Sequence, residues 1–207
     1  RLLWSRNVLD VLVGDDAGPP RAFPECTQFV ALGDTIYIAY GSRCAVLDAA
    51  SGKTARPALT LPGGGRWYEL RVWQDYIVAT SGSTLLALAR RTGEVLWQTE
   101  MAHARVGLAV GNKRVFVGDG ETRAHDIQTG EVLWRVKGGT ALRYSSRHDI
   151  LLNESGLYRG TDGHCRAERT FIVNRRSFWQ DHVELAYLAG DRLLFSARPI
   201  SSDGRPI

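Results

Sequence analysis

Charged and aromatic side chains occur in the segments that we expect to form loops leading into the strands of this chain or connecting them. These residues are the ones whose chemistry best suits ligand binding: Arg43, Arg66, Trp67, Glu69, His103, Arg105, Glu121, Arg143, Asp181 and His182. Guanidinium and imidazole groups pair with carboxylates or phosphates, and an indole ring offers an apolar face for stacking. Together they predict a polar, mostly basic surface for a partner peptide or a small anionic ligand.

Motifs that would indicate catalysis are missing from the sequence. It contains no Gly-x-Ser-x-Gly elbow, no Walker phosphate loop and no His-Glu-x-x-His. Gly63-Gly64-Gly65 follows Pro62 with no predicted helix after it, which indicates a linker and not a phosphate cradle. Asp15-Asp16 supplies too few carboxylates for a calcium loop. The residues themselves therefore predict no catalytic, cofactor-binding or metal site.

The three cysteines, Cys26, Cys44 and Cys165, form no Cys-x-x-Cys pair. Zinc-ribbon, thioredoxin-like and haem-attachment sites are therefore not expected. A Cys26–Cys44 disulfide is an alternative that spacing alone does not decide. The neighbours His164 and Cys165 would point to opposite faces of a strand, which argues against a shared zinc ion.

Composition fits an ordinary globular protein of 207 residues with a net charge of +4. No apolar run is long enough to span a bilayer, so we expect no transmembrane segment. Arg175-Arg176 beside Phe178-Trp179 is the one local candidate for a nucleic-acid contact, and a solvated strand end explains it as well. We therefore predict no nucleic-acid partner.

An internal repeat organises the chain. The clearest copies run from Gln74 to Trp97 and from Asn112 to Trp134, each with two apolar alternating runs and a Thr-Gly-Glu turn before a run that ends in Trp. An earlier copy, Gly33 to Lys53, lacks the closing Trp, and weaker copies begin at His148 and Gly190. Apolar alternation indicates strands, and repeats of this length are typical of propeller blades with four strands each.

The repeat predicts an all-β fold, a β-propeller of antiparallel four-stranded blades. Expected blade units are 26–60, 66–100, 103–137, 141–175 and 183–207, with 1–5 as an outer strand. Their innermost strands should be Thr27–Leu32, Tyr68–Trp73, Arg105–Val110, Ala141–Ser145 and Val183–Ala189. Trp97 and Trp134 should then wedge between adjacent blades, as structural residues. In such a ring, loops from every blade meet at one end, where the ten polar and aromatic residues would gather.

The segment Leu86-Ala87-Leu88 followed by Thr92-Gly93-Glu94-Val95-Leu96-Trp97 resembles the repeat of pyrroloquinoline-quinone-type propellers. His125 to Trp134 matches nearly as well, and Val46 to Lys53 matches without the Trp. The same repeat is similar to that of outer-membrane barrel-assembly scaffold lipoproteins and of secreted quinoprotein-like propellers. The resemblance is clear from Gly33 to Arg135.

The resemblance implies a non-catalytic scaffold that binds a protein partner in the periplasm or outside the cell. A first alternative is a segment of a quinoprotein oxidoreductase that holds pyrroloquinoline quinone and calcium through residues outside this chain. A second is a secreted glycan-associated propeller, because the pairs Trp67-Tyr68 and Phe178-Trp179 could stack on sugars.

The start of the chain, Arg1-Leu2-Leu3-Trp4, resembles Glu94-Val95-Leu96-Trp97, which belongs to an outer strand. The sequence leaves two arrangements open. Residues 1–5 can complete the last blade and close a ring of about five, or the chain can be a segment of a larger ring. We favour the segment, because the last blade would still lack its third strand.

Overall fold

The computed structural model describes residues 4–5, 28–103, 106–139, 142–168, 186–189 and 192–195. Within them lie four complete antiparallel sheets of four strands and one pair of strands, each connected in sequence order. This is the predicted all-β propeller architecture. The only helical element among the described residues is a short turn, η1 (Pro62–Gly64), in the Gly-rich linker.

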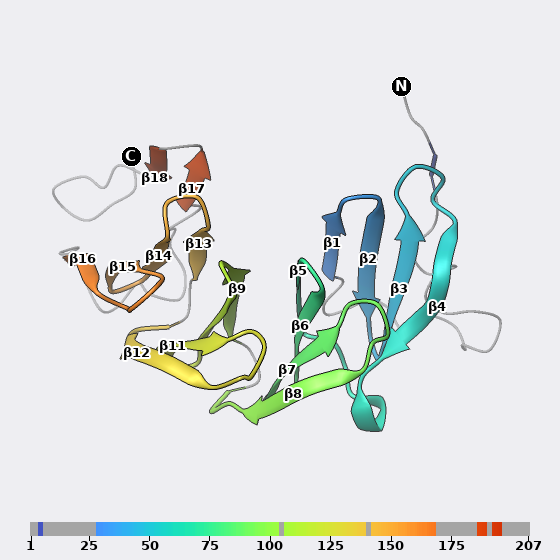
Figure 1. The fold of residues 1–207 in the computed structure, drawn as a ribbon, viewed down its shortest axis with the longest axis horizontal. Helices are drawn as coiled ribbons and strands as arrows, with labels where there is room; N and C mark the ends of the chain where they lie inside the picture. Colours follow the sequence, from blue (N-terminus) through green and yellow to red (C-terminus); the bar gives the residue numbers. More distant parts are fainter. Residues whose placement is uncertain are drawn as a thin grey trace, which may run out of the picture.

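Each sheet is one blade, and its strands follow one another from the inside of the arc outwards (Figure 1). Blade 1 consists of β1 (Gln28–Leu32), β2 (Thr35–Tyr40), β3 (Arg43–Asp48) and β4 (Thr54–Thr60). Blade 2 consists of β5 (Glu69–Trp73), β6 (Tyr76–Ser81), β7 (Thr84–Ala89) and β8 (Val95–Glu100). Blade 3 consists of β9 (Gly107–Gly111), β10 (Arg114–Gly118), β11 (Glu121–Asp126) and β12 (Val132–Lys137). Blade 4 consists of β13 (Arg143–Ser145), β14 (Ile150–Asn153), β15 (Gly156–Arg159) and β16 (Cys165–Glu168), and β17 (Ala186–Ala189) pairs with β18 (Arg192–Phe195) beyond it.

The inner strands β1, β5, β9 and β13 lie next to one another in that order, and the outer strands β4, β8, β12 and β16 lie on the outside (Figure 1). Apolar residues on both faces of the second and third strands are buried between neighbouring blades. One cluster joins Tyr37 and Val46 of blade 1 to Leu70 and Leu88 of blade 2. Burial of these two-sided strands is the main stabilising contribution of the fold.

Turns between third and outer strands repeat the same backbone geometry in all four blades. Gly52, Gly93, Gly130 and Gly163 each have a positive φ, between 66° and 80°. A side chain there would be strained, which explains the recurring Ser/Thr/Asp-Gly pair in the sequence. Gly130 and Gly163 also leave space for an indole ring from the preceding blade.

Two tryptophans fill that space, as predicted. Trp97 of β8 packs on Gly130 of blade 3 and donates a hydrogen bond from Nε1 to the Ile127 carbonyl at 2.8 Å. Trp134 of β12 does the same with Gly163 and with the Gly160 carbonyl, at 3.0 Å. Each outer strand is thus fastened to the next blade by one apolar contact and one hydrogen bond.

Blade 1 lacks this tryptophan, and two other residues take over its contacts. Leu59 of β4 lies over Gly93, where the indole ring would be. The Arg56 guanidinium donates to the backbone carbonyls of Arg90 and Arg91. At the joint between blades 1 and 2, the Leu59 contact therefore stands in place of the indole ring, and the Arg56 hydrogen bonds stand in place of the indole N–H bond.

Cys44 of β3 is buried and carries a free thiol. Burial raises the pKa of this thiol to about 12, an effect that the nearby Arg56 charge opposes. Cys165 is exposed and also free, whereas Cys26 lies outside the described residues.

Candidate functional site

The connectors between blades and the turns between second and third strands lie at the same end of the described blades, which we name the loop end. The connector from β4 to β5 is fixed by a hydrogen bond from the Trp67 backbone N–H to the Gly41 carbonyl, at 2.8 Å. In the next connector, the Met101 N–H donates to the Ser83 carbonyl at 2.7 Å. In the third, the Gly139 N–H donates to Glu154 Oε1 at 2.5 Å.

The inner strands present an ion pair at this end. Glu69 and Arg71 lie two residues apart on the same face of β5, and Arg71 Nη1 lies 3.2 Å from Glu69 Oε2. Arg71 Nε also donates to the Leu108 carbonyl of β9 at 3.1 Å, which joins two neighbouring inner strands. Desolvation raises the pKa of Glu69, and the charges of Arg71 and Arg143 oppose the shift.

Exposed basic side chains also occur at the loop end. Arg43 begins β3, Arg66 lies in the first connector and Arg143 begins β13, and all three are exposed. His103 is exposed in the second connector. Arg143 belongs to blade 4, and its charge acts on Glu69 of blade 2. Charged groups of two nonadjacent blades therefore interact at the loop end.

Trp67 has a different position from these residues. It is 2 % exposed and packs in the cluster between blades 1 and 2, and its Nε1 donates to the Ser42 carbonyl at 3.3 Å. The ring therefore holds the connector against blade 1 and presents almost no surface to a ligand. Arg105, Asp181 and His182 lie outside the described residues.

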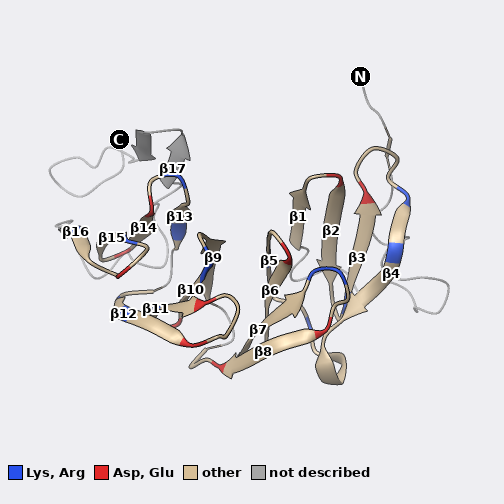
Figure 2. Ribbon diagram, viewed as in Figure 1, with Lys and Arg blue, Asp and Glu red and all other residues tan. Residues whose placement is uncertain are grey.

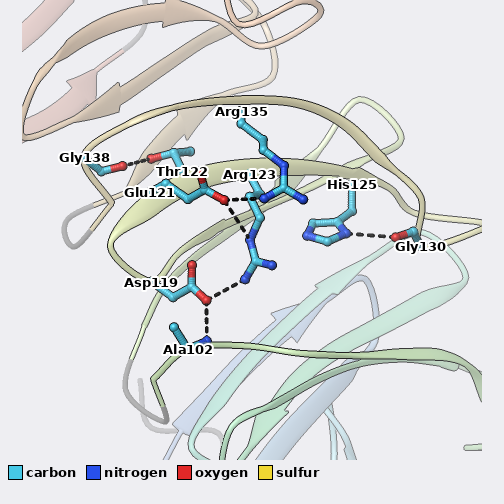
Figure 3. Close-up of polar contacts among 9 residues, drawn as sticks. All are labelled: Ala102, Asp119, Glu121, Thr122, Arg123, His125, Gly130, Arg135 and Gly138. Atoms are coloured by element: carbon cyan, nitrogen blue, oxygen red, sulfur yellow. Dashed lines mark hydrogen bonds and ion pairs between the residues drawn. The ribbon is translucent and has the colours of Figure 1, made fainter.

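Glu121 belongs to a polar network that fastens the second connector to blade 3 (Figure 3). Its Oε1 lies 2.6 Å from Arg135 Nη1 and 4.0 Å from Arg123 Nε. Arg123 in turn pairs with Asp119 at 2.5 Å, and Asp119 accepts the Ala102 N–H at 2.8 Å. The Arg123 and Asp119 side chains are only 12 % and 3 % exposed, so this pair fixes the loop geometry, whereas Glu121 is open to solvent.

Arg71, Asp119 and Arg123 were not among the residues predicted from the sequence. Arg71 could have been found, because strand alternation places it on the same face as Glu69. Asp119 and Arg123 gave no such signal, because their role depends on a connector that lies 17 residues away from Asp119 in the chain.

Both signs of charge are distributed over the four blades, with no block of one sign along the described strands (Figure 2). Within the described ranges, no helix is long and apolar enough to cross a membrane. Nor do three or more His, Cys, Asp or Glu side chains of these residues come together in a geometry that could hold a metal ion.

Comparison with known proteins agrees with the repeat. Residues 81–158 match the family model described as outer membrane protein assembly factor BamB. No curated protein is significantly similar to the chain.

Three solved structures match parts of the chain. BamB from Moraxella catarrhalis matches with a TM-score of 0.50 and 17% identity, over 80% of this chain and 64% of that one. The computationally designed Ika4 protein matches with a TM-score of 0.51 and 18% identity, over 64% of this chain and 86% of that one. The designed Ika8 protein matches at 0.49 and 18%, over 66% of this chain and 43% of that one.

The chain thus spans less than two thirds of the BamB structure. The four-stranded blades, the docked tryptophans and the solved structures show a β-propeller, and residues 81–158 carry a PQQ-like repeat that resembles that of the outer-membrane assembly factors.

Proposed function

We propose that this propeller is a non-catalytic scaffold that binds a protein partner at its loop end. The observation that carries the proposal is the Glu69–Arg71 pair at the loop end, together with the exposed Arg66 of the first connector and the exposed Arg143, whose charge acts on Glu69. An exposed guanidinium group can form charge-assisted hydrogen bonds with a carboxylate of an incoming chain, and arginine is enriched where protein surfaces meet. A partner segment rich in carboxylates fits this surface best.

Hydrogen bonds that anchor the connectors support the same role. Hydrogen bonds of the Trp67, Met101, Ala102 and Gly139 backbone N–H groups hold the described parts of the three connectors, so these parts lose little conformational entropy when a partner binds. The resemblance to the assembly factor BamB favours a partner in outer-membrane protein assembly, and a periplasmic or outer-membrane-associated location. A small anionic ligand would use the same cations.

Charge reversal tests the proposal. The double variant Arg66→Glu, Arg143→Glu should lose most of the partner that co-purifies with the protein after mild cross-linking in its own cells. Lys53→Glu is the matched control, because Lys53 is exposed in a turn between third and outer strands, at the other end of blade 1. All substituted side chains are exposed, so the urea midpoint should not change. Equal recovery of the partner by the double variant and the control would refute the proposal.

A further inference from the structure

The buried imidazole of His125 faces two guanidinium groups in the joint between blades 2 and 3. Its Nδ1 lies 2.9 Å from the Gly130 carbonyl oxygen, which can only accept a hydrogen bond, so Nδ1 carries the donated proton. In the neutral ring, Nε2 then has a lone pair and no proton, and it is buried without a hydrogen-bond partner. The ring edge that carries Nε2 points away from Gly130 and toward Arg123 and Arg135 (Figure 3). A buried polar atom without a partner is unusual in a folded protein and indicates a bound group between the ring and the cations.

Arg123 adds a second unused nitrogen on the same face. It lies two residues before His125 on β11, so both side chains point toward blade 2, where Trp97 stacks on the imidazole. Arg123 Nη2 pairs with Asp119. Its Nε is buried without a hydrogen-bond partner, because Glu121 Oε1 lies 4.0 Å away. Two polar nitrogens of one strand face therefore lack partners at the same place.

Arg135 brings further N–H donors from the neighbouring strand. Strand register places it on β12 directly opposite Arg123. It uses Nη1 for Glu121, at 2.6 Å, and its side chain is 55 % exposed, so this edge of the joint is open to solvent. The other nitrogens of its guanidinium group can donate to a ligand that enters there.

The corresponding positions of blade 2 show that the fold does not need these nitrogens. Strand register gives Leu88, Leu86 and Gln98 as the counterparts of the imidazole and the two guanidinium groups. Leu88 and Leu86 are 0 % and 3 % exposed and belong to an apolar cluster. Blade 3 thus has an imidazole and a guanidinium where blade 2 has two packed leucines, which favours a binding role for the polar groups.

Protonation of His125 makes the place suitable for an anion. The charged groups that act on the ring are Arg123, Arg135 and Asp119, and the blade 2 residue stacked on it is uncharged. Because Glu121 pairs with Arg135, two carboxylates then face three cations, and one positive charge is left uncompensated. The protonated Nε2 also becomes a donor, beside the unused Nε donor of Arg123. Both the donors and the net charge therefore suit an acceptor with a negative charge.

We propose that the joint between blades 2 and 3 binds one small oxyanion, such as phosphate or sulfate, between the protonated Nε2 of His125 and the guanidinium groups of Arg123 and Arg135. Charge-assisted hydrogen bonds from all three side chains hold it. Because the imidazole is fully buried and the Arg123 side chain is 12 % exposed, the ligand is a free ion and not a carboxylate of another protein. This site shares no residue with the Glu69–Arg71 pair and does not depend on the partner proposed for the loop end.

Proton and anion should bind together at this site. Burial lowers the pKa of His125, and the two arginine charges lower it further. A bound oxyanion opposes both effects, because it accepts a hydrogen bond from the protonated ring and offsets the charge of the arginines. By linkage, protonation of His125 strengthens anion binding by the same factor by which the anion strengthens proton binding.

Histidine NMR of the full-length protein tests the proposal, with sulfate as the probe. Sulfate keeps its charge over the pH range in which histidine titrates, and chloride keeps the ionic strength constant. Sulfate should raise the pH at which His125 titrates, by about one pH unit at a tenfold excess over its dissociation constant. The exposed His164 should titrate at nearly the same pH with and without sulfate. The spectrum of His125→Leu identifies the signal.

Arg135→Gln separates the proposed site from a general effect of sulfate. This change to an exposed side chain should leave the urea midpoint nearly unchanged and remove most of the response of His125 to sulfate. Arg91→Gln, in an exposed turn of blade 2, should keep the full response. A response in Arg135→Gln as large as in the wild type would overturn the proposal. A His125 titration that sulfate does not move would also overturn it, and would assign the place beside Nε2 to a bound water.

Discussion

The indole of Trp97 stacks on the imidazole of His125 across the joint between blades 2 and 3, with ring centroids 6.1 Å apart and planes inclined by 13°. His125 is fully buried. Its Nδ1 lies 2.9 Å from the Gly130 carbonyl, and its Nε2 is buried without a hydrogen-bond partner. The equivalent residues in blades 1 and 2 are Leu47 and Leu88, so blade 3 has a titratable imidazole where blades 1 and 2 have an aliphatic side chain.

Replacing His125 should change the pH dependence of stability. Desolvation lowers the pKa of His125, an effect that the Gly130 hydrogen bond opposes and that Arg123 and Arg135 increase. The unfolded chain therefore binds this proton more readily, and stability falls as the pH drops below the ordinary histidine pKa of 6.5. His125→Leu should resist urea better than the wild type at about pH 5 and similarly at about pH 8.

His164→Leu is the control for this measurement, because His164 is exposed. It should leave the pH dependence as it is in the wild type. A His125→Leu protein that loses as much stability on acidification as the wild type would show that this ring does not carry the effect.

Removal of Trp97 should open the joint between blades 2 and 3. Trp97→Ala loses a buried ring and one hydrogen bond, so we expect a loss of about 3–5 kcal/mol in the free energy of unfolding. Trp97→Phe keeps most of the packing and should lose about 1 kcal/mol with the N–H donor. Urea denaturation measures both, and Leu96→Ala on the same strand should change stability by less than about 0.5 kcal/mol. Equal effects of Trp97→Ala and Leu96→Ala would contradict this account of the joint.

Arg56 should matter more than an exposed arginine normally does. Its guanidinium bonds two carbonyls of blade 2 at once, and a lysine ammonium does not reproduce that fork. We expect Arg56→Lys to lower the unfolding free energy by about 1–2 kcal/mol. Arg91→Lys, a change to an exposed side chain in the turn that Arg56 contacts, should be neutral. If Arg56→Lys left the free energy of unfolding unchanged, the stability of this joint would come from the Leu59 contact alone.

Two glycines at the third connector should tolerate no side chain. A Cβ on Gly118 would overlap the backbone carbonyl of Gly139, and a Cβ on Gly139 would approach the Glu121 carbonyl oxygen to 2.6 Å. Backbone atoms do not move aside cheaply, so Gly118→Ala should cost about 3 kcal/mol or prevent folding of blade 4. Gly82→Ala is the control: its φ of 54° adds strain of about 1 kcal/mol, but the space around it is open. Comparable urea midpoints for the two variants would show that the close backbone contact is not formed.

Strands and turns could be predicted because each is encoded within about ten residues. Apolar alternation gives the two faces of β6 or β10, and the Ser/Thr-Gly pair gives the turn before the outer strand. The wedge role of Trp97 could be predicted too, because the tryptophan recurs at one position of the repeat. Contacts between blades were harder to predict from the sequence. The burial of Trp67 against Ser42, and the pairing of Arg56 with blade 2, join residues 25 to 35 positions apart.

The candidate site was predicted only in part, for the same reason. Strand order indicates which loops lie at one end of a propeller, and Arg43, Arg66, His103 and Arg143 do lie in such positions. It does not tell which side chains turn inward, so Trp67 was expected beside the cations and is instead buried. Arg71 was overlooked, although it links Glu69 to the next inner strand.

Site-specific photo-cross-linking tests the proposed function most directly. A photoreactive amino acid is placed at Arg143, on the loop end, and separately at Lys53, on the opposite end of blade 1, in the full-length protein in its own cells. The account predicts a discrete protein cross-link from position 143 and none from position 53. A cross-link from position 53 alone, or no protein product from position 143, would contradict the claim that the loop end is the partner-binding surface.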